Sequence, residues 1–263
     1  MVRSSVTRAS SRFKRLISAA CSATSDLARG DFENCAFQVY SDLVLTPSRS
    51  ATSLTGTIRL GLYDQSSANP DAHIHDAIAT FDKVAPRVKI ELSFDTLTAL
   101  ENGVFGGKLD LAVVPVFLPN TALKIERLYA ETMRLYCGKG HEMFGQDTAN
   151  IAPHEILSSH KYAGYAFNSP NMQAGNRLNL IRAANVKDEE ALALLVQSGR
   201  YIGFLADHYA ENSGGQERYW PLFPTRLSYD VQFAAIYRQQ PAPDRKTSTF
   251  LDCLLRAHDS ARS

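Results

Sequence analysis

Small polar side chains follow apolar segments at three places in this chain of 263 residues. Each group stands where an apolar, strand-like segment ends, and a helix is expected to begin after the groups at 64–67 and 95–98. The candidates are Gln65, Ser66, Ser67, Thr96, Thr98, Asn168 and Ser169. Hydroxyl and amide groups beside a helix N-terminus, which offers free backbone N–H groups, are suited to bind a small anion. The chemistry predicted for them is reversible binding of a small molecule, and a small carboxylate is favoured.

Each of these residues also has an ordinary structural role. Ser and Thr in front of a helix cap its first N–H groups more often than they contact a ligand. Asp64 stands where an anion would arrive, so it could select a cationic or neutral ligand instead, or point to solvent. Phe117 and Phe204 are added as apolar contacts of the same site, although packing is narrowly the favoured role of Phe117. The charge of the ligand is therefore left open.

Catalysis is not expected of this chain. The sequence contains no G-x-S-x-G, P-loop, G-x-G-x-x-G or H-E-x-x-H motif, and its Asp, Ser and His residues form no arrangement typical of a triad. Four cysteines (Cys21, Cys35, Cys137, Cys253) are far apart and show no metal-ligand spacing, so we expect free thiols in a reducing compartment. We predict no catalytic residue, no cofactor and no metal.

Hydrophobic periodicity predicts the elements that must position the polar groups. Strands at 57–63, 88–94 and 109–115 alternate with helices at 70–84 and 98–107, which is typical of a parallel α/β unit. A second succession follows, with strand-like segments at 131–137, 161–167, 201–206 and 231–237 and helices at 188–198 and 247–258. In such sheets a ligand binds beyond the carboxyl ends of the strands, where the polar groups stand.

Composition fits a soluble globular protein, with 44% hydrophobic and 21% charged residues and a net charge of +1. Residues 1–56 hold seven Lys or Arg against four Asp or Glu, a basic start that suits phosphate contact or a solvated tail. The apolar run 109–118 is shorter than the roughly 20 residues of a membrane span. No signal peptide is recognisable. We therefore expect a cytoplasmic location and no membrane partner.

Several segments, taken in order, resemble the effector-binding domain of the LysR-type transcriptional regulators. Residues 56–61 (GTIRLG) resemble the family's entry strand, and 107–112 (GKLDLA) its G-x-L-D-L-A segment. Residues 131–135 (ETMRL) resemble its E-x-L-x-L strand, and 195–205 (LVQSGRYIGFL) are similar to L-V-x-x-G-x-G-I-x-L-L. Phe81, followed by Ala-Pro-Arg-Val at 85–88, is similar to its F…P-x-V passage.

The resemblance implies an α/β, type 2 periplasmic-binding-protein-like fold with two lobes, parallel-rich sheets and a cleft between the lobes. Lobe 1 would comprise 57–137 plus about 240–258, and lobe 2 would comprise 138–239. A small effector would bind in the cleft and couple to oligomer state and DNA binding. Family members pair their sensor domains antiparallel, so a homodimer or tetramer is expected, with the helix at 71–84 against a partner's second lobe.

The first 56 residues depart from the family. Its winged helix-turn-helix carries a Ser-Gln pair that does not occur here, and only eight residues (48–55) separate the wing-like segment 43–47 from Gly56, too few for the linker helix. Residues 1–56 are therefore predicted to be a degenerate or truncated segment, and DNA binding is in doubt. The alternative is a solute-binding protein or a stand-alone sensor of the same fold without DNA binding, although a solute-binding protein requires an export signal.

Overall fold

Strands and helices alternate at the start of the unit Ser53–Ser263. It is the second of two units into which the chain divides, and the first is Met1–Thr52. The computed structural model describes residues 54–63, 66, 68–117 and 122–261, so most of the N-terminal segment predicted to be degenerate lies outside the described residues. The first elements of the second unit are β1 (Gly56–Tyr63), η2 (Pro70–Ala72), α3 (Ile74–Val84), β2 (Val88–Asp95), α4 (Leu97–Phe105) and β3 (Leu111–Pro115).

The helix predicted at 70–84 is divided into η2 and α3. His73 separates them, with a φ of 47° in the left-handed region, which no residue inside an α-helix adopts. Pro70 occupies the first position of η2, where its missing N–H is no loss, and Asn69 caps it. Asn69, in front of η2, also donates a hydrogen bond of 3.0 Å to Glu131 further along the chain.

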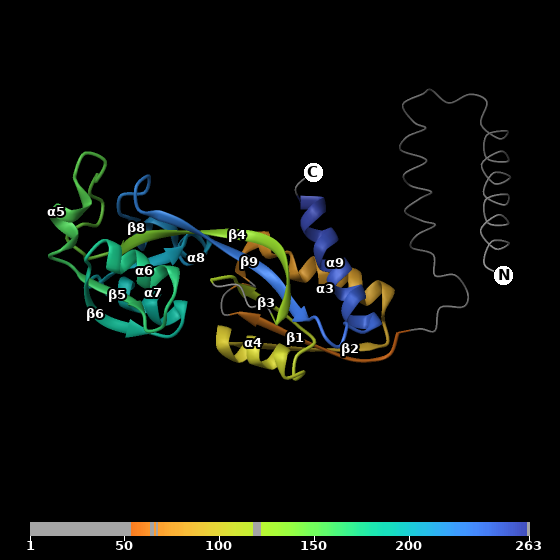
Figure 1. Cartoon of the computed structure of the whole chain (residues 1–263). Helices are drawn as coiled ribbons and strands as arrows, with labels where there is room; N and C mark the ends of the chain where they lie inside the picture. The colour runs from red at the N-terminus through yellow and green to blue at the C-terminus, as the bar shows by residue number, and fades with distance from the viewer. Residues whose placement is uncertain (1–53, 64–65, 67, 118–121, 262–263) are drawn as a thin grey trace, which may run out of the picture. The chain divides into compact units, whose positions relative to one another are not determined.

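Two long antiparallel strands, β4 (Leu123–Gly138) and β9 (Ser228–Arg238), connect two groups of elements (Figure 1). The strand predicted to begin at 131 already begins at Leu123. Its first half pairs with the end of β9, Leu123 opposite Arg238, and its second half pairs with β7. The charged residues Lys124, Glu126 and Arg127 interrupt the apolar pattern, which is why the sequence did not predict the first half.

The second group of elements follows β4. It consists of α5 (Pro153–Leu157), β5 (Lys161–Tyr165), α6 (Pro170–Arg177), β6 (Ile181–Val186), α7 (Glu189–Gln197), β7 (Ile202–Ala206), α8 (Asp207–Asn212), η3 (Gly215–Glu217) and β8 (Tyr219–Pro221), and α9 (Arg245–Ala261) comes after β9. The helix α6 and the strand β6 were not predicted. The α6 sequence, PNMQAGNR, has almost no apolar periodicity, and β6 is an edge strand with alternate residues exposed.

The strands form one sheet in the order β2-β1-β3-β9-β4-β7-β5-β6, with β8 paired to β4. Pairs at the two ends are parallel, and the pairs that involve β4 or β9 are antiparallel. We call the β2-β1-β3 end with α3, α4 and α9 the first lobe, and the β7-β5-β6 end with α5 to α8 the second lobe. The predicted α/β class with parallel-rich sheets is confirmed.

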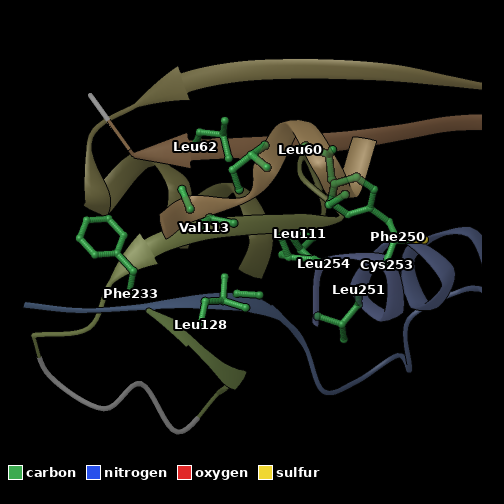
Figure 2. Packing of buried hydrophobic residues seen from close by; sticks show 14 of the residues in the cluster. Leu60, Leu62, Leu111, Val113, Leu128, Phe233, Phe250, Leu251, Cys253 and Leu254 are labelled. Carbon is green, nitrogen blue, oxygen red and sulfur yellow. The ribbon is translucent and has the colours of Figure 1, made fainter. Parts of the chain in front are cut away.

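Each lobe has its own apolar core. In the first lobe, Leu60 and Leu62 of β1 and Leu111 of β3 pack with Phe250 and Leu254 of α9 (Figure 2). Phe81 of α3 meets Phe250 edge to face, with ring centroids 5.3 Å apart, so the C-terminal helix closes the first lobe. In the second lobe Leu135, Tyr162, Ile202 and Phe204 are fully or almost fully buried together. No helix among the described residues is long and apolar enough to cross a membrane.

Candidate functional site: the cavity between the lobes

A narrow cavity of about 30 Å³ lies where the two lobes meet. The strands β1, β3 and β5 point their carboxyl ends at it, and β4 and β9 cross beside it. The first lobe contributes Tyr63, Pro115 and Phe117, the crossover strands contribute Glu131, Met133, Tyr229, Val231 and Phe233, and the second lobe contributes Tyr165, Ser169, Pro170, Asn171 and Glu189. We call this space the interlobe cavity. Its position agrees with the general rule for ligand sites in open α/β sheets.

Two helix N-termini of the second lobe open toward the interlobe cavity. Ser169 caps α6 by accepting a hydrogen bond of 3.3 Å from the backbone N–H of Met172. Asp188 caps α7 by accepting one of 2.8 Å from the N–H of Ala191, which places Glu189 in the first turn of the helix. The positive end of the helix dipole stabilises a carboxylate at that position. Ser169 therefore combines the capping role with a place in the cavity wall.

Asn171 connects the cavity wall to the sheet of the second lobe. Its Oδ1 accepts hydrogen bonds from the Tyr162 hydroxyl (2.6 Å) and the backbone N–H of Tyr165 (3.3 Å), and its Nδ2 donates to the carbonyl of Phe204 (3.3 Å). The side chain is buried, so these bonds replace water that the amide would otherwise need. Asn171 thus fixes α6 against β5 and β7, beside the point where α6 and β5 reach the cavity.

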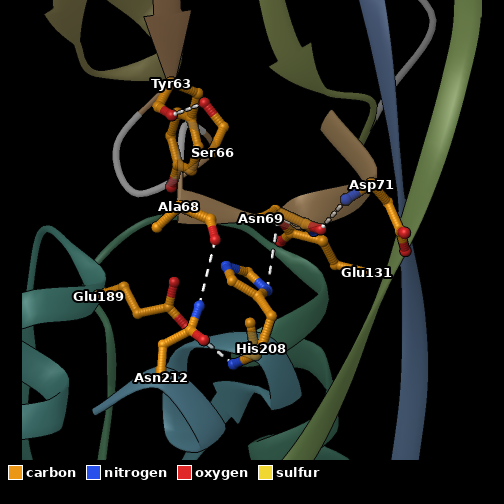
Figure 3. A network of polar contacts seen from close by, with 10 residues as sticks. Tyr63, Ser66, Ala68, Asn69, Asp71, Glu131, Glu189, His208 and Asn212 are labelled. Atoms are coloured by element: carbon orange, nitrogen blue, oxygen red, sulfur yellow. Dashed lines mark hydrogen bonds and ion pairs between the residues drawn. The ribbon is translucent and has the colours of Figure 1, made fainter. Parts of the chain in front are cut away.

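Glu131 forms the centre of a polar network between the lobes (Figure 3). Its Oε1 accepts a hydrogen bond of 3.0 Å from Nδ2 of Asn69 and lies 3.9 Å from Nδ1 of His208 on α8. Asn212, on the same helix, donates a hydrogen bond of 3.2 Å to the carbonyl of Ala68 in the first lobe. Burial lowers the pKa of His208, and Asp71 opposes that shift. Residues of both lobes therefore meet at one carboxylate on a crossover strand.

Glu189 brings a second carboxylate to the cavity. Its Oε1 accepts a hydrogen bond of 2.7 Å from the backbone N–H of Ala206 at the end of β7. Glu131 and Glu189 are each only 7% exposed. Among the described residues that line the cavity, none is Lys, Arg or His. The described lining therefore holds two carboxyl side chains, and its other polar groups are tyrosine hydroxyls, Ser169 and Asn171.

The structure brings together some of the residues predicted from sequence and separates others. Phe117 and Ser169 line the interlobe cavity. Ser66 is buried beside it and donates its hydroxyl hydrogen to the carbonyl of Tyr63. Thr96 caps α4 through the N–H of Ala99 and is exposed, as is Thr98. Gln65 and Ser67 lie outside the described residues.

Two further predicted residues lie in the second lobe, away from the cavity lining. Asn168 is exposed and accepts a hydrogen bond of 3.4 Å from Nε2 of Gln173. Phe204 is buried between Tyr162 and Tyr229, with ring centroids 6.4 and 5.3 Å away. It supports Tyr229, which does line the cavity, and does not reach the cavity itself.

Sequence reasoning missed both glutamates as site residues. Glu131 was assigned only to a motif of a strand, and Glu189 only to the acidic start of a helix. The available signal was the position of Glu189 in the acidic first turn of the helix predicted at 188–198. Glu131 carried no such signal, because only the pairing of β4 with β9 places it between the lobes. No group of three or more potential metal ligands occurs in the described part of the chain.

Two α/β lobes that are joined by two crossover strands around a buried cavity define a two-lobed protein of the small-molecule-binding class. Comparison with known families makes the assignment specific. The model of the LysR substrate binding domain matches residues 51–259, and the chain belongs to this family. The resemblance predicted from sequence is confirmed.

Relatives and solved structures agree with this assignment. The chain is 28% identical over 201 residues to the HTH-type transcriptional activator BauR of Pseudomonas aeruginosa, a match that covers 76% of this chain and 66%, just under two thirds, of that protein. The effector binding domain of QuiR in complex with shikimate is similar with a TM-score of 0.66 and 14% identity, over 79% of this chain and 99% of that one. The regulatory domain of CcmR from Synechocystis PCC6803, in complex with 2-PG, is similar with a TM-score of 0.63 and 15% identity. That match covers 78% of this chain and 98% of the CcmR chain.

Proposed function

We propose that this chain is the sensor of a LysR-type transcriptional regulator and that a small-molecule effector binds in the interlobe cavity. The observation that carries the proposal is the composition of the cavity wall, because both lobes and both crossover strands contribute to it. An effector held there contacts both lobes at once. The similarity to a transcriptional activator favours a regulatory outcome of that binding over catalysis or transport.

The mechanism follows from the position of the cavity. A ligand that contacts both lobes binds one arrangement of the lobes better than another, and it shifts the population toward that arrangement by its difference in affinity. The contacts that would respond first are those that connect the lobes, Asn212 with Ala68 and Glu131 with Asn69 and His208. The small effector is therefore expected to act on the geometry between the lobes.

Two sheet edges provide surfaces that can transmit such a change to a second copy. Phe94 on the edge strand β2 is 53% exposed, and Ile181 on the opposite edge strand β6 is 54% exposed. Leu92 on β2 and Leu194 on α7 are also exposed apolar side chains. An antiparallel pair of copies would cover the first-lobe edge of each with the second-lobe edge of the other, in a self-complementary interface. We propose a homodimer of this kind, which can associate further to a tetramer.

Binding of DNA by the full protein completes the proposed function. A gel-shift assay with the full chain and candidate operator fragments, run with and without effector, tests it. An effector-dependent change in retained DNA supports a regulator. If the protein retains no DNA even at low salt, where phosphate contacts are strongest, the chain is a sensor that does not itself bind DNA.

Binding in the cavity can be followed separately. The chain has a single tryptophan, Trp220, so the double variant Phe117→Trp, Trp220→Phe has one indole, in the cavity wall. A saturable change in its fluorescence on addition of a compound locates binding in the cavity. A compound that raises the unfolding midpoint without changing this signal binds elsewhere.

A further inference from the structure

A second cavity lies within the second lobe and has a volume of about 250 Å³, against about 30 Å³ for the interlobe cavity. The helix α6, the strand β7 and the segment that leads into β9 contribute its wall. Among the described lining residues the two cavities share only Tyr229, so they are separate spaces. We call the larger one the second-lobe pocket. Its volume is close to the lower end of the range for small-molecule sites, about 300–1,000 Å³.

The described lining of the second-lobe pocket includes two arginines and no acidic residue. Arg177 is the last residue of α6 and is exposed, and Arg226 stands two residues before β9. Neither side chain forms an ion pair within the part of the chain that the structure describes. Both positive charges are therefore available to an anion that enters the pocket.

Arg226 is held in place by uncharged groups. Its Nη2 donates hydrogen bonds to the backbone carbonyls of Thr148 and Ile151, and its guanidinium lies 5.2 Å from the ring centroid of Phe223. A guanidinium has five N–H groups, so the hydrogens on Nε and Nη1 are left for a ligand. Such a fixed, planar pair of donors matches the two oxygens of a carboxylate.

Arg177 acts on the same wall of the pocket. Burial raises the pKa of Tyr229 well above its usual value, and the positive charge of Arg177 opposes that shift. Arg177 therefore lies within electrostatic range of a ring that lines the pocket. Asp230, the acidic residue next to Tyr229, accepts a hydrogen bond of 2.9 Å from the hydroxyl of Thr132.

The end of α6 is the feature that opposes an anion, because the last carbonyls of a helix carry partial negative charge. Those carbonyls already accept hydrogen bonds from the backbone that follows. The carbonyl of Ala174 accepts from the N–H of Leu178, and the carbonyls of the next two residues accept from Asn179 and Leu180. The two full charges of the arginines thus meet only partial charges whose hydrogen-bonding capacity is in use.

The remaining wall of the pocket is mainly apolar. Phe204 is 1% exposed, and the partly buried side chains of Leu178, Leu227 and Tyr229 complete this part of the lining. Apolar walls with a few charged groups are typical of sites for small organic molecules. An ammonium ligand would meet two positive charges, and inorganic phosphate has no apolar body to cover the walls.

We propose that the second-lobe pocket is a further ligand site, specific for a small organic carboxylate. The carboxylate group binds to Arg177 and Arg226, and the apolar body packs against Phe204 and Leu227. The site is distinct from the interlobe cavity, so the inference does not depend on the proposed function.

Titration calorimetry on the full chain tests the ligand class. The probes are acetate, butyrate and benzoate, with butylammonium, butanol and inorganic phosphate as controls, all at one ionic strength. We expect saturable binding of butyrate and benzoate and none of butylammonium. From acetate to butyrate the affinity should rise roughly threefold for each CH₂ group that is buried. In nitrogen-edited NMR spectra the signal of the Arg226 Nε–H group should shift as butyrate is added.

Arginine variants test the location. Arg177→Gln is expected to fold, because the side chain is exposed, and to weaken binding of butyrate at least about fivefold. Arg226→Lys keeps a positive donor for the two carbonyls but loses the planar fork, and it should weaken binding at least about threefold. Arg200→Gln is the matched control, since Arg200 is an exposed arginine of the same lobe outside the pocket lining. It should change the affinity less than about twofold, and circular dichroism checks the fold of all three variants.

The inference is overturned by any of three results. Butyrate affinity that is unchanged in both Arg177→Gln and Arg226→Lys would place the binding elsewhere. Phosphate or butylammonium that binds as tightly as butyrate would contradict the ligand class, and the absence of binding from the whole panel would contradict the site. Each of these results leaves the proposed function standing, because that function depends on the interlobe cavity and on operator DNA.

Discussion

The side-chain amide of Asn212 donates a hydrogen bond of 3.2 Å to the backbone carbonyl of Ala68, which connects the last residue of α8 in the second lobe to the loop that follows β1 in the first. The two residues are 144 positions apart in the chain. The bond lies beside the network around Glu131 (Figure 3). A movement that separates the lobes must break this hydrogen bond, so a variant that lacks the bond should bind ligand with a different affinity.

Asn212→Ala is expected to affect ligand affinity more clearly than folding. The bond is solvent-exposed, so water replaces it in the variant and the free energy of unfolding should fall by no more than about 1 kcal/mol. If the effector binds the arrangement in which the bond is formed, its affinity should fall by up to about fivefold. Urea unfolding and the cavity fluorescence titration measure the two effects. Glu211→Ala, an exposed neighbour, should change neither.

Asn171→Ala should destabilise the second lobe strongly. The substitution removes three hydrogen bonds and leaves the buried Tyr162 hydroxyl without its 2.6 Å acceptor. The expected loss in the free energy of unfolding is about 2–4 kcal/mol, measured by urea denaturation. Gln173→Ala on the exposed side of the same helix should cost less than about 0.5 kcal/mol. Equal effects of the two variants would contradict the role assigned to Asn171.

The sequence predicted most of the fold because the first-lobe elements obey local rules. The alternation of Val88 to Phe94 and the apolar run before Pro115 each match one element, and the family motifs provide their order. The crossover strands were harder to predict, since the first half of β4 is stabilised by its pairing with β9 and not by its own pattern. The helix α6 is polar and short, so only its cap and its packing specify it.

The candidate site could be predicted only in part, for the same reason. Phe117 comes two residues after the end of β3 and Ser169 four residues after the end of β5, and a strand end is a local signal. Glu131 lies within a strand, and its place between the lobes depends on contacts with Asn69 and His208, which are 62 and 77 positions away along the chain. Sequence patterns report position along an element, whereas the presence of Glu131 and Glu189 in one cavity wall depends on which elements meet.

Gly138 at the end of β4 is expected to tolerate no side chain. A Cβ atom at this position would lie 2.1 Å from the carbonyl oxygen of Val196, and a backbone atom of α7 cannot move away as a flexible side chain can. Gly138→Ala should therefore lower the free energy of unfolding by about 3 kcal/mol or more. Gly140→Ala is the control, since nothing lies within 4 Å of its Cβ and only the strain of its φ of +93° remains, about 1 kcal/mol. Chemical denaturation of both variants checks the difference.

His208 should make stability depend on pH in one direction. Burial lowers its pKa below 6.5 in the folded state, so the unfolded chain takes up a proton more readily. The contribution of neutral His208 to the free energy of unfolding is therefore complete above about pH 6.5. It decreases as the pH falls below that value, by at most about 1.4 kcal/mol per pH unit for one group. His208→Asn should reduce this decrease between pH 7.5 and 5.5 in urea unfolding.

Phe94→Glu should separate the proposed dimer into monomers. The side chain is exposed on the edge strand β2, and an added charge there must be desolvated when the edge of a second copy covers it. The dissociation constant of the dimer should rise at least tenfold by sedimentation equilibrium, and Ile181→Glu on the opposite edge should act in the same way. Phe105→Glu, at an aromatic side chain on α4 that is 64% exposed, is the control and should leave association intact. If the control variant also weakens association, or if the two edge variants leave the dissociation constant of the dimer unchanged, the interface lies on another surface.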